Sequence, residues 1–88
     1  MKEIKWNINY YMKVKLTQAG IDELKRRHEE RARKFPQVKI FQKPFELKLD
    51  KDGYYRKQGW VIMEELGHMC LMGGALPFSC NVIIEVDE

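Results

Sequence analysis

Apolar and polar residues alternate along the N-terminal part of the chain, and this is the clearest pattern in the sequence. From Ile4 to Leu16 the even positions are apolar or aromatic, whereas the odd positions carry lysine and asparagine together with Tyr11. Because the side chains of a strand point alternately to its two faces, this pattern predicts a half-buried β-strand. Strands usually run to about five or six residues. We therefore expect a long or bent strand whose most regular part is 10–16.

The next segment has apolar residues at helical spacing. Thr17 is a typical N-cap, Ile21 and Leu24 follow at helical intervals, and Pro36 ends the pattern. The sequence predicts a helix from Gln18 to Lys34. Each of its acids stands four residues before a base, an order that stabilises a solvent-facing helix. The predicted pairs are Asp22 with Arg26, Glu23 with Arg27, Glu29 with Arg33, and Glu30 with Lys34.

Two short extended segments and a turn are predicted in the middle of the chain. The segments are 38–41 and 45–49, and Pro44 restricts the second to an edge strand or an extended arm. The run 50–53 ends in glycine and has the composition of a turn.

A second helix is predicted from Tyr55 or Arg56 to Leu71, followed by a closing strand. The helix would bury Trp60, Met63, Leu66 and Cys70 on one face. Beyond it, Cys80, Val82, Ile84 and Val86 alternate with more polar positions. We expect this last strand to lie beside the first, with its acids opposite Lys13 and Lys15.

These elements predict an α+β fold in one small domain spanning residues 1–88. The order is strand, helix, extended arm, helix, strand, with the N-terminal and C-terminal strands adjacent, and residues 1–11 are a candidate extension of the first strand. The predicted core consists of Ile8, Tyr10, Met12, Val14, Leu16, Ile21, Leu24, Phe35, Trp60, Met63, Leu66, Val82 and Ile84.

Charge is distributed unevenly along the chain. The net charge is +3, but all sixteen Lys and Arg lie at or before Lys57, where eight acids oppose them, and the remaining five acids follow. The first part therefore carries +8 and the last part −5. Such a split leads either to ion pairs between the two parts or to a basic and an acidic pole on the surface.

Apolar runs such as 60–63 are far shorter than the roughly 20 residues that span a bilayer, and the N-terminus lacks the apolar stretch of a signal peptide. We therefore expect a cytoplasmic protein without membrane contact. In that compartment Cys70 and Cys80 are most simply buried apolar residues. Their spacing does not form a metal-binding motif.

No set of nucleophile, base and orienting group is recognisable in the sequence. His28 lies on the apolar stripe of the first helix, where we expect it to pack, and His68 follows Glu64 by one helical turn, as in a surface contact. Neither Ser79 nor the pair Gly73-Gly74 stands in a nucleophile or phosphate-loop motif. We expect a protein that is not an enzyme and that holds no cofactor or metal.

Nucleic-acid binding is the alternative function. It would use the basic face of the first helix, namely Lys25, Arg27, Arg31 and Lys34, with exposed tyrosines as stacking partners. However, interleaved acids leave this helix with a net charge of only +2. We expect weak, sequence-independent binding at most.

Residues from Met12 to the C-terminus resemble a family of small uncharacterised proteins encoded by bacteriophages and prophages. The resemblance is carried by Lys13-Val14-Lys15-Leu16-Thr17 with Gly20, Leu24 and His28, by Phe35-Pro36, by Asp52-Gly53-Tyr54 with Gln58 and Trp60, and by Gly67, Met69, Gly73, Pro77-Phe78 and Asn81. It implies an accessory protein of a mobile element, which commonly binds a host enzyme or defence component.

We therefore expect a non-enzymatic phage or prophage protein that binds and modulates a bacterial host protein, with components of defence among the candidate targets. The sequence marks no particular residues as the protein-binding surface. It also leaves self-association open.

Overall fold

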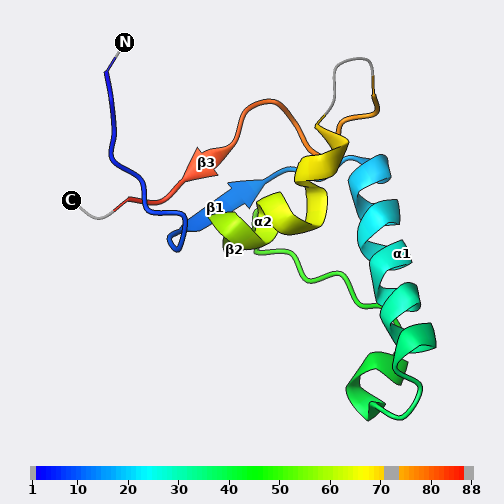
Figure 1. Cartoon of the computed structure of the whole chain (residues 1–88). Coiled ribbons are helices and arrows are strands. Elements are labelled where there is room, and N and C mark those ends of the chain that lie inside the picture. The colour runs from blue at the N-terminus through cyan, green and yellow to red at the C-terminus, as the bar shows by residue number, and fades with distance from the viewer. Residues whose placement is uncertain (1, 71–73, 87–88) are drawn as a thin grey trace.

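A three-stranded antiparallel sheet lies at the centre of the molecule, in the order β2-β1-β3. The computed structural model describes residues 2–70 and 74–86. β1 (Tyr11–Val14) is the middle strand, between β2 (Tyr55–Gln58) and β3 (Ile83–Ile84) (Figure 1). The fold is α+β, and the first and last strands are adjacent, as the sequence predicts.

The alternation of the first strand is confirmed where it pairs. Met12 and Val14 are buried, whereas Tyr11 is exposed on the other face. Met12 stands opposite Lys57 on one side and opposite Ile84 on the other. The strand is shorter than predicted because Tyr10 N–H bonds back to the carbonyl of Asn7 in a turn. The segment before this turn belongs to no strand.

The ladder between β1 and the C-terminal segment contains a bulge. Leu16 forms an isolated bridge with Phe78. If the antiparallel pairing continued without a break from that bridge, Lys13 would lie opposite Asn81. Lys13 pairs instead with Ile83, so the C-terminal segment contains two extra residues, which form the bulge.

The first helix, α1, spans Gln18–Lys34 and has the predicted bounds. The Thr17 hydroxyl accepts a hydrogen bond from the Gly20 amide at 3.3 Å, which caps the first turn. Leu24 turns into the core. Gly20 lies so close to the Pro77 carbonyl that a Cβ atom would stand 2.0 Å from the oxygen.

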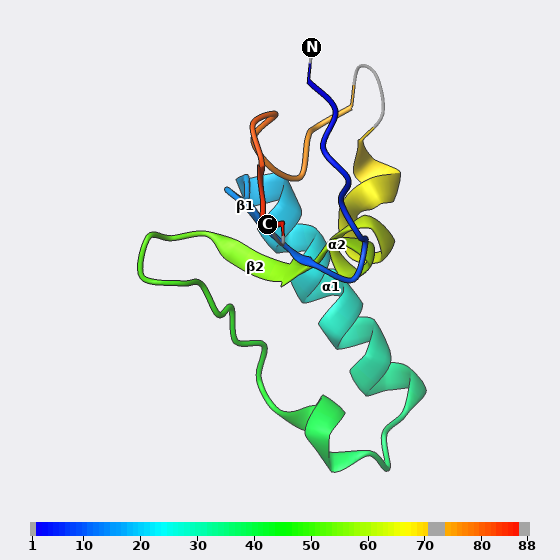
Figure 2. The same ribbon diagram turned by 90° about the vertical axis from the view of Figure 1, so that its left-hand side faces the viewer.

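The prediction of an extended segment at 38–41 is wrong. A 3-10 helix, η1 (Lys39–Gln42), replaces it, and the Gln42 amide donates to the carbonyls of Ala32 and Phe35 at the end of α1. Residues 43–49 form no strand but an extended arm that leads back towards β2 (Figure 2). The predicted turn follows, with Gly53 at φ +83°.

The second helix begins later and ends earlier than predicted. Tyr55 to Gln58 are strand β2, because they pair with β1. Helix α2 spans Gly59–Leu66, and a 3-10 turn, η2 (Gly67–Met69), follows it. Gly59 lies against the Trp6 ring, which would stand 2.1 Å from an added Cβ atom. The close approach of Trp6 explains a glycine at this helix end.

The core is smaller than predicted. Its buried members are Met12, Val14, Leu24, Tyr55, Ile62 and Leu66. The prediction was wrong for six residues that are substantially exposed, namely Ile8, Phe35, Trp60, Met63, Val82 and Ile84. Cys70 and Cys80 are also exposed free thiols, against the expectation that they are buried. No helix in the described ranges is long and apolar enough to cross a membrane.

Candidate functional site

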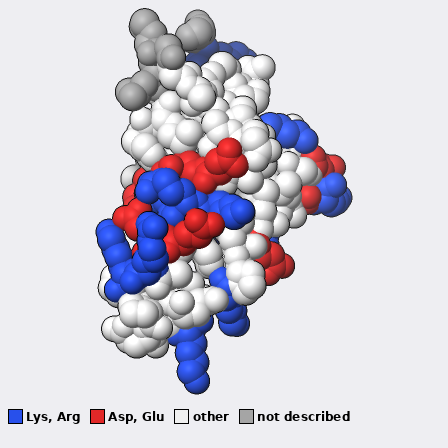
Figure 3. Space-filling view, turned by 90° about the vertical axis from the view of Figure 1, so that its right-hand side faces the viewer, with Lys and Arg blue, Asp and Glu red and all other residues white. Residues whose placement is uncertain are grey.

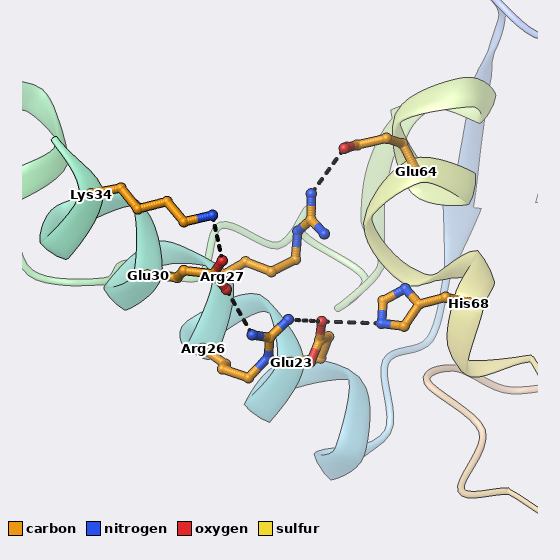
Figure 4. A network of polar contacts seen from close by, with 7 residues as sticks. All are labelled: Glu23, Arg26, Arg27, Glu30, Lys34, Glu64 and His68. Atoms are coloured by element: carbon orange, nitrogen blue, oxygen red, sulfur yellow. Dashed lines mark hydrogen bonds and ion pairs between the residues drawn. The ribbon is translucent and has the colours of Figure 1, made fainter.

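Ion pairs connect residues within α1 and also link α1 to α2 (Figure 4). Arg26 bridges Glu23 and Glu30 at 2.8 Å each, and Lys34 also binds Glu30. Hydrogen bonds from Arg26 hold the pKa of Glu23 below its usual value, and those from Lys34 and Arg26 do the same for Glu30. On the face that α1 presents in Figure 3, acidic and basic side chains are therefore intermixed.

These contacts correct the predicted pairing. Of the four predicted pairs, only Glu30 with Lys34 is an ion pair in the described part of the chain. Asp22 accepts instead from Gln18, while Glu23 binds Arg26 and His68. His68 thus makes a surface contact as expected, but its partner lies on α1.

Three of the four candidate nucleic-acid-binding residues, Arg27, Arg31 and Lys34, lie on one side of α1 and line one hollow of about 280 Å³. Arg27 binds Glu64 on α2 at 2.9 Å, and Lys34 binds Glu30. Lys25 lies about 160° around the helix axis from Arg27. Arg31 has no ion-pair partner in the described ranges and lines a cleft beside the helix. The structure thus brings Arg27, Arg31 and Lys34 together around one hollow and separates only Lys25 from them.

Part of the charge split is satisfied inside the molecule. Arg27 to Glu64 and Arg56 to Glu85 each join the basic first part of the chain to the acidic last part. The Arg56 guanidinium lowers the pKa of Glu85 through two hydrogen bonds. Glu85 therefore faces Arg56 on β2, and Lys13 binds Asp50 at 3.8 Å instead of an acid of the last strand.

A cleft of about 350 Å³ lies between α1, the arm and β2. Its lining includes Arg27 and Arg31 from α1, Lys43 and Lys48 from the arm, and Lys57 from β2. Glu46 and Glu65 are the carboxylates among the lining residues. Among the charged residues of the lining, cations contributed by three segments therefore outnumber carboxylates by five to two.

Two residues that line this cleft, Tyr55 and His28, are held in place by hydrogen bonds. Tyr55 donates its hydroxyl proton to Glu65 at 2.7 Å, and burial together with this bond raises the pKa of the phenol. His28 lies half-buried on α1, with Nε2 at 2.6 Å from the Lys43 carbonyl and its ring tilted against Phe45. His28 therefore packs and fastens the arm to the helix, as expected of a packing residue.

The outer edge of β3 is an unpaired strand edge with apolar side chains. Val82, Ile83 and Ile84 are consecutive and 38%, 44% and 38% exposed. Since Lys13 pairs with Ile83 and the Glu85 amide bonds to the Tyr11 carbonyl, the N–H and C=O of Ile84 point away from β1. The opposite edge, β2, carries Arg56 and Lys57, which are typical of a protected edge.

A hollow of about 260 Å³ adjoins the end of β3. Tyr10 and Tyr11 line it together with Asn9, Glu85 and Val86. The chain's own Arg56 already occupies part of this group, since its guanidinium lies 3.9 Å from the Tyr11 ring centroid and forms two hydrogen bonds with Glu85. Sequence reasoning missed both the hollow and the cleft because each forms only where segments distant in the sequence meet.

In the residues that the structure describes, no three His, Cys, Asp or Glu side chains gather where they would hold a metal ion. No family model, no curated protein and no solved structure matches the chain. The resemblance to phage and prophage proteins therefore stays a prediction.

Proposed function

We propose that the chain is a non-enzymatic phage or prophage accessory protein that binds and modulates a bacterial host protein, a defence component being one such target. The observation that supports a binding role is the open edge of β3. A strand edge with outward N–H and C=O groups and exposed β-branched side chains is a template for an added strand. Natural sheets protect such edges with Lys or Pro, with bulges or with short strands. β3 is short and lies beside a bulge, but the segment from Cys80 to Glu88 contains neither Lys nor Pro.

The bound segment would be extended and apolar on alternate positions. Its apolar side chains would cover Val82 and Ile84, which are exposed without a partner strand. Glu85 is already paired with Arg56, so main-chain hydrogen bonds and the apolar side chains would carry the contact.

Capture from bacterial lysate with three forms of the protein tests this function. The Ile84→Pro variant loses the outward amide but no bond to β1, since that amide does not take part in the existing ladder. The Ile84→Ala variant is the matched control, because it keeps the amide and shortens the same side chain. We expect one protein to be retained by the parent and by Ile84→Ala and to be lost with Ile84→Pro.

All three forms are compared by thermal melting, so that loss of capture is not confused with unfolding. Equal retention by a folded Ile84→Pro variant would contradict strand addition at β3. Turnover of a small substrate by the purified chain would contradict the non-enzymatic role.

Sequence-independent nucleic-acid binding by the first helix remains a weaker alternative. Two of its four cations, Arg27 and Lys34, are already neutralised by carboxylates, and Lys25 points elsewhere. Each phosphate contact contributes about one unit to the salt dependence of binding. Tight, steeply salt-sensitive retention of DNA or RNA that is lost with Arg27→Glu and Arg31→Glu would favour this alternative over protein binding.

A further inference from the structure

The cleft between α1, the arm and β2 contains cations without ion-pair partners. Arg31, Lys43, Lys48 and Lys57 form no ion pair among the described residues, although most other cations of α1 are paired. They come from three segments that are brought together only by the fold. The two carboxylates in the lining, Glu46 and Glu65, are outnumbered by five cations. The cleft therefore has a positive potential that favours an anion.

One wall of the cleft is apolar and partly aromatic. Phe45 and Leu47 on the arm are half-buried and pack against the core, and Ile40 of η1, which is 65% exposed, also lines the cleft. The Phe45 ring lies 5.8 Å from the His28 ring, measured between centroids, so the arm is held in place against the helix. An anion alone would gain nothing from this wall. A flat, apolar ring attached to the anion would cover it.

We infer that this cleft binds a mononucleotide, that is, a phosphate ester carrying an aromatic base. The Arg31 guanidinium offers the planar pair of donors that matches a phosphate, and Lys48 and Lys57 add charge from the opposite side. The base lies against Phe45. The volume of about 350 Å³ falls in the range of small-ligand sites.

This site is independent of the proposed protein-binding function, because none of its lining residues lies on β3. The hollow that adjoins the cleft along α1 shares Arg27 and Arg31 with it and also has Lys34 in its lining. Arg27 and Lys34 there are paired with Glu64 and Glu30, so they offer less to the further phosphates of a nucleic-acid chain. The ligand is therefore a single nucleotide and not a polymer.

Amide NMR titration at physiological salt tests this inference with adenosine monophosphate, adenosine, inorganic phosphate and a short oligothymidine. We expect saturable shifts with adenosine monophosphate at residues of the cleft, and at least about tenfold weaker binding of adenosine and of phosphate, since each supplies half of the contacts. Replacing Arg31 and Lys48 together by Gln should weaken nucleotide binding at least about tenfold.

The matched control replaces Lys25 and Arg33 by Gln. It removes the same charge from exposed positions that do not line the cleft. Because salt screens charges at such a distance, the affinity for the nucleotide should change by no more than about twofold. Three results would overturn the inference: no saturable binding up to about 10 mM nucleotide, phosphate alone binding as tightly as the nucleotide, or equal losses in both double variants. Oligothymidine binding well above that of the mononucleotide would also overturn it, in favour of a polymer.

Discussion

Two glycines mark where segments of the chain approach too closely for a side chain. Gly20 on α1 faces the Pro77 backbone and Gly59 at the start of α2 faces the Trp6 ring. The sequence showed both glycines but not their reason, because each depends on a residue far away in the chain. Gly67 looked similar in the sequence, yet the nearest atom to an added Cβ there is Met63 Cβ at 3.8 Å, an ordinary contact.

Replacing Gly20 and Gly67 by alanine should affect the stability of the protein differently. Gly20→Ala should destabilise the protein by about 3 kcal/mol or more, because the new methyl group meets backbone that has little room to move. Gly67→Ala should be neutral or stabilising by about 0.5 kcal/mol, because Gly67 has helical dihedral angles and open space. Urea unfolding of both variants measures this. Equal stabilities would mean that α1 does not lie against Pro77.

The carboxylate of Glu23 should make the protein sensitive to acid. Its pKa is lowered in the folded state, chiefly by the hydrogen bond from Arg26, so its contribution to stability is present above the unfolded pKa of about 4.3 and is lost as pH falls through the folded pKa. Glu23→Gln should therefore lose less unfolding free energy between about pH 7 and pH 3 than the parent.

Glu29→Gln is the control for this measurement, because it removes the same charge from an exposed position without an ion pair in the described part of the chain. It should follow the pH profile of the parent. A Glu23→Gln profile parallel to that of the parent would show that the contact with Arg26 does not stabilise the fold.

At the scale of elements, α1 was predictable and α2 was not. The bounds of α1 follow from Thr17 and Pro36, two local signals that act on the backbone directly. In α2 the residues from Trp60 to Met63 are all apolar, so no polar position marks the outer face. The prediction placed Trp60 and Met63 inside, whereas the packed stripe is Gly59, Ile62 and Leu66.

The corrected orientation of α2 predicts which side chains stabilise it. Ile62→Ala should destabilise the protein by about 3 kcal/mol, because it leaves a cavity at a fully buried position. Trp60→Ala should cost less despite the larger truncation, since the Trp60 side chain is 45% exposed. Thermal unfolding of the two variants compares them. A larger loss for Trp60→Ala would restore the orientation that the sequence predicted.

At the scale of the whole molecule, the sequence predicted that the first and last strands are adjacent. It did not predict that α1, η1 and the arm together project from the sheet as a limb. Adjacency of the first and last strands followed from their alternation, but β2 was assigned to a helix because its pairing with β1 is a long-range contact. The limb made by α1, η1 and the arm contributes to a radius of gyration of 14.6 Å, against about 12 Å for a compact chain of this length. This shape leaves both the cleft and the β3 edge exposed.

The positions of the two candidate surfaces, the cleft and the β3 edge, could not be predicted from the sequence. The charges that line the cleft were visible in the sequence, but their convergence depends on an arm without regular structure. The β3 edge was expected to be core, and its exposure follows from the absence of a further strand beyond β3 in the described residues.

The central claim is that a partner segment pairs with the free edge of β3, and amide hydrogen exchange at Ile84 tests it most directly. The Ile84 and Arg56 amides both point outward, one from each edge of the sheet, so each should exchange rapidly in the free protein. In the complex with the protein captured from lysate, the Ile84 amide should exchange at least about tenfold more slowly while the Arg56 amide is unchanged. An unchanged rate at Ile84, or slowing at Arg56 alone, would contradict strand addition at β3.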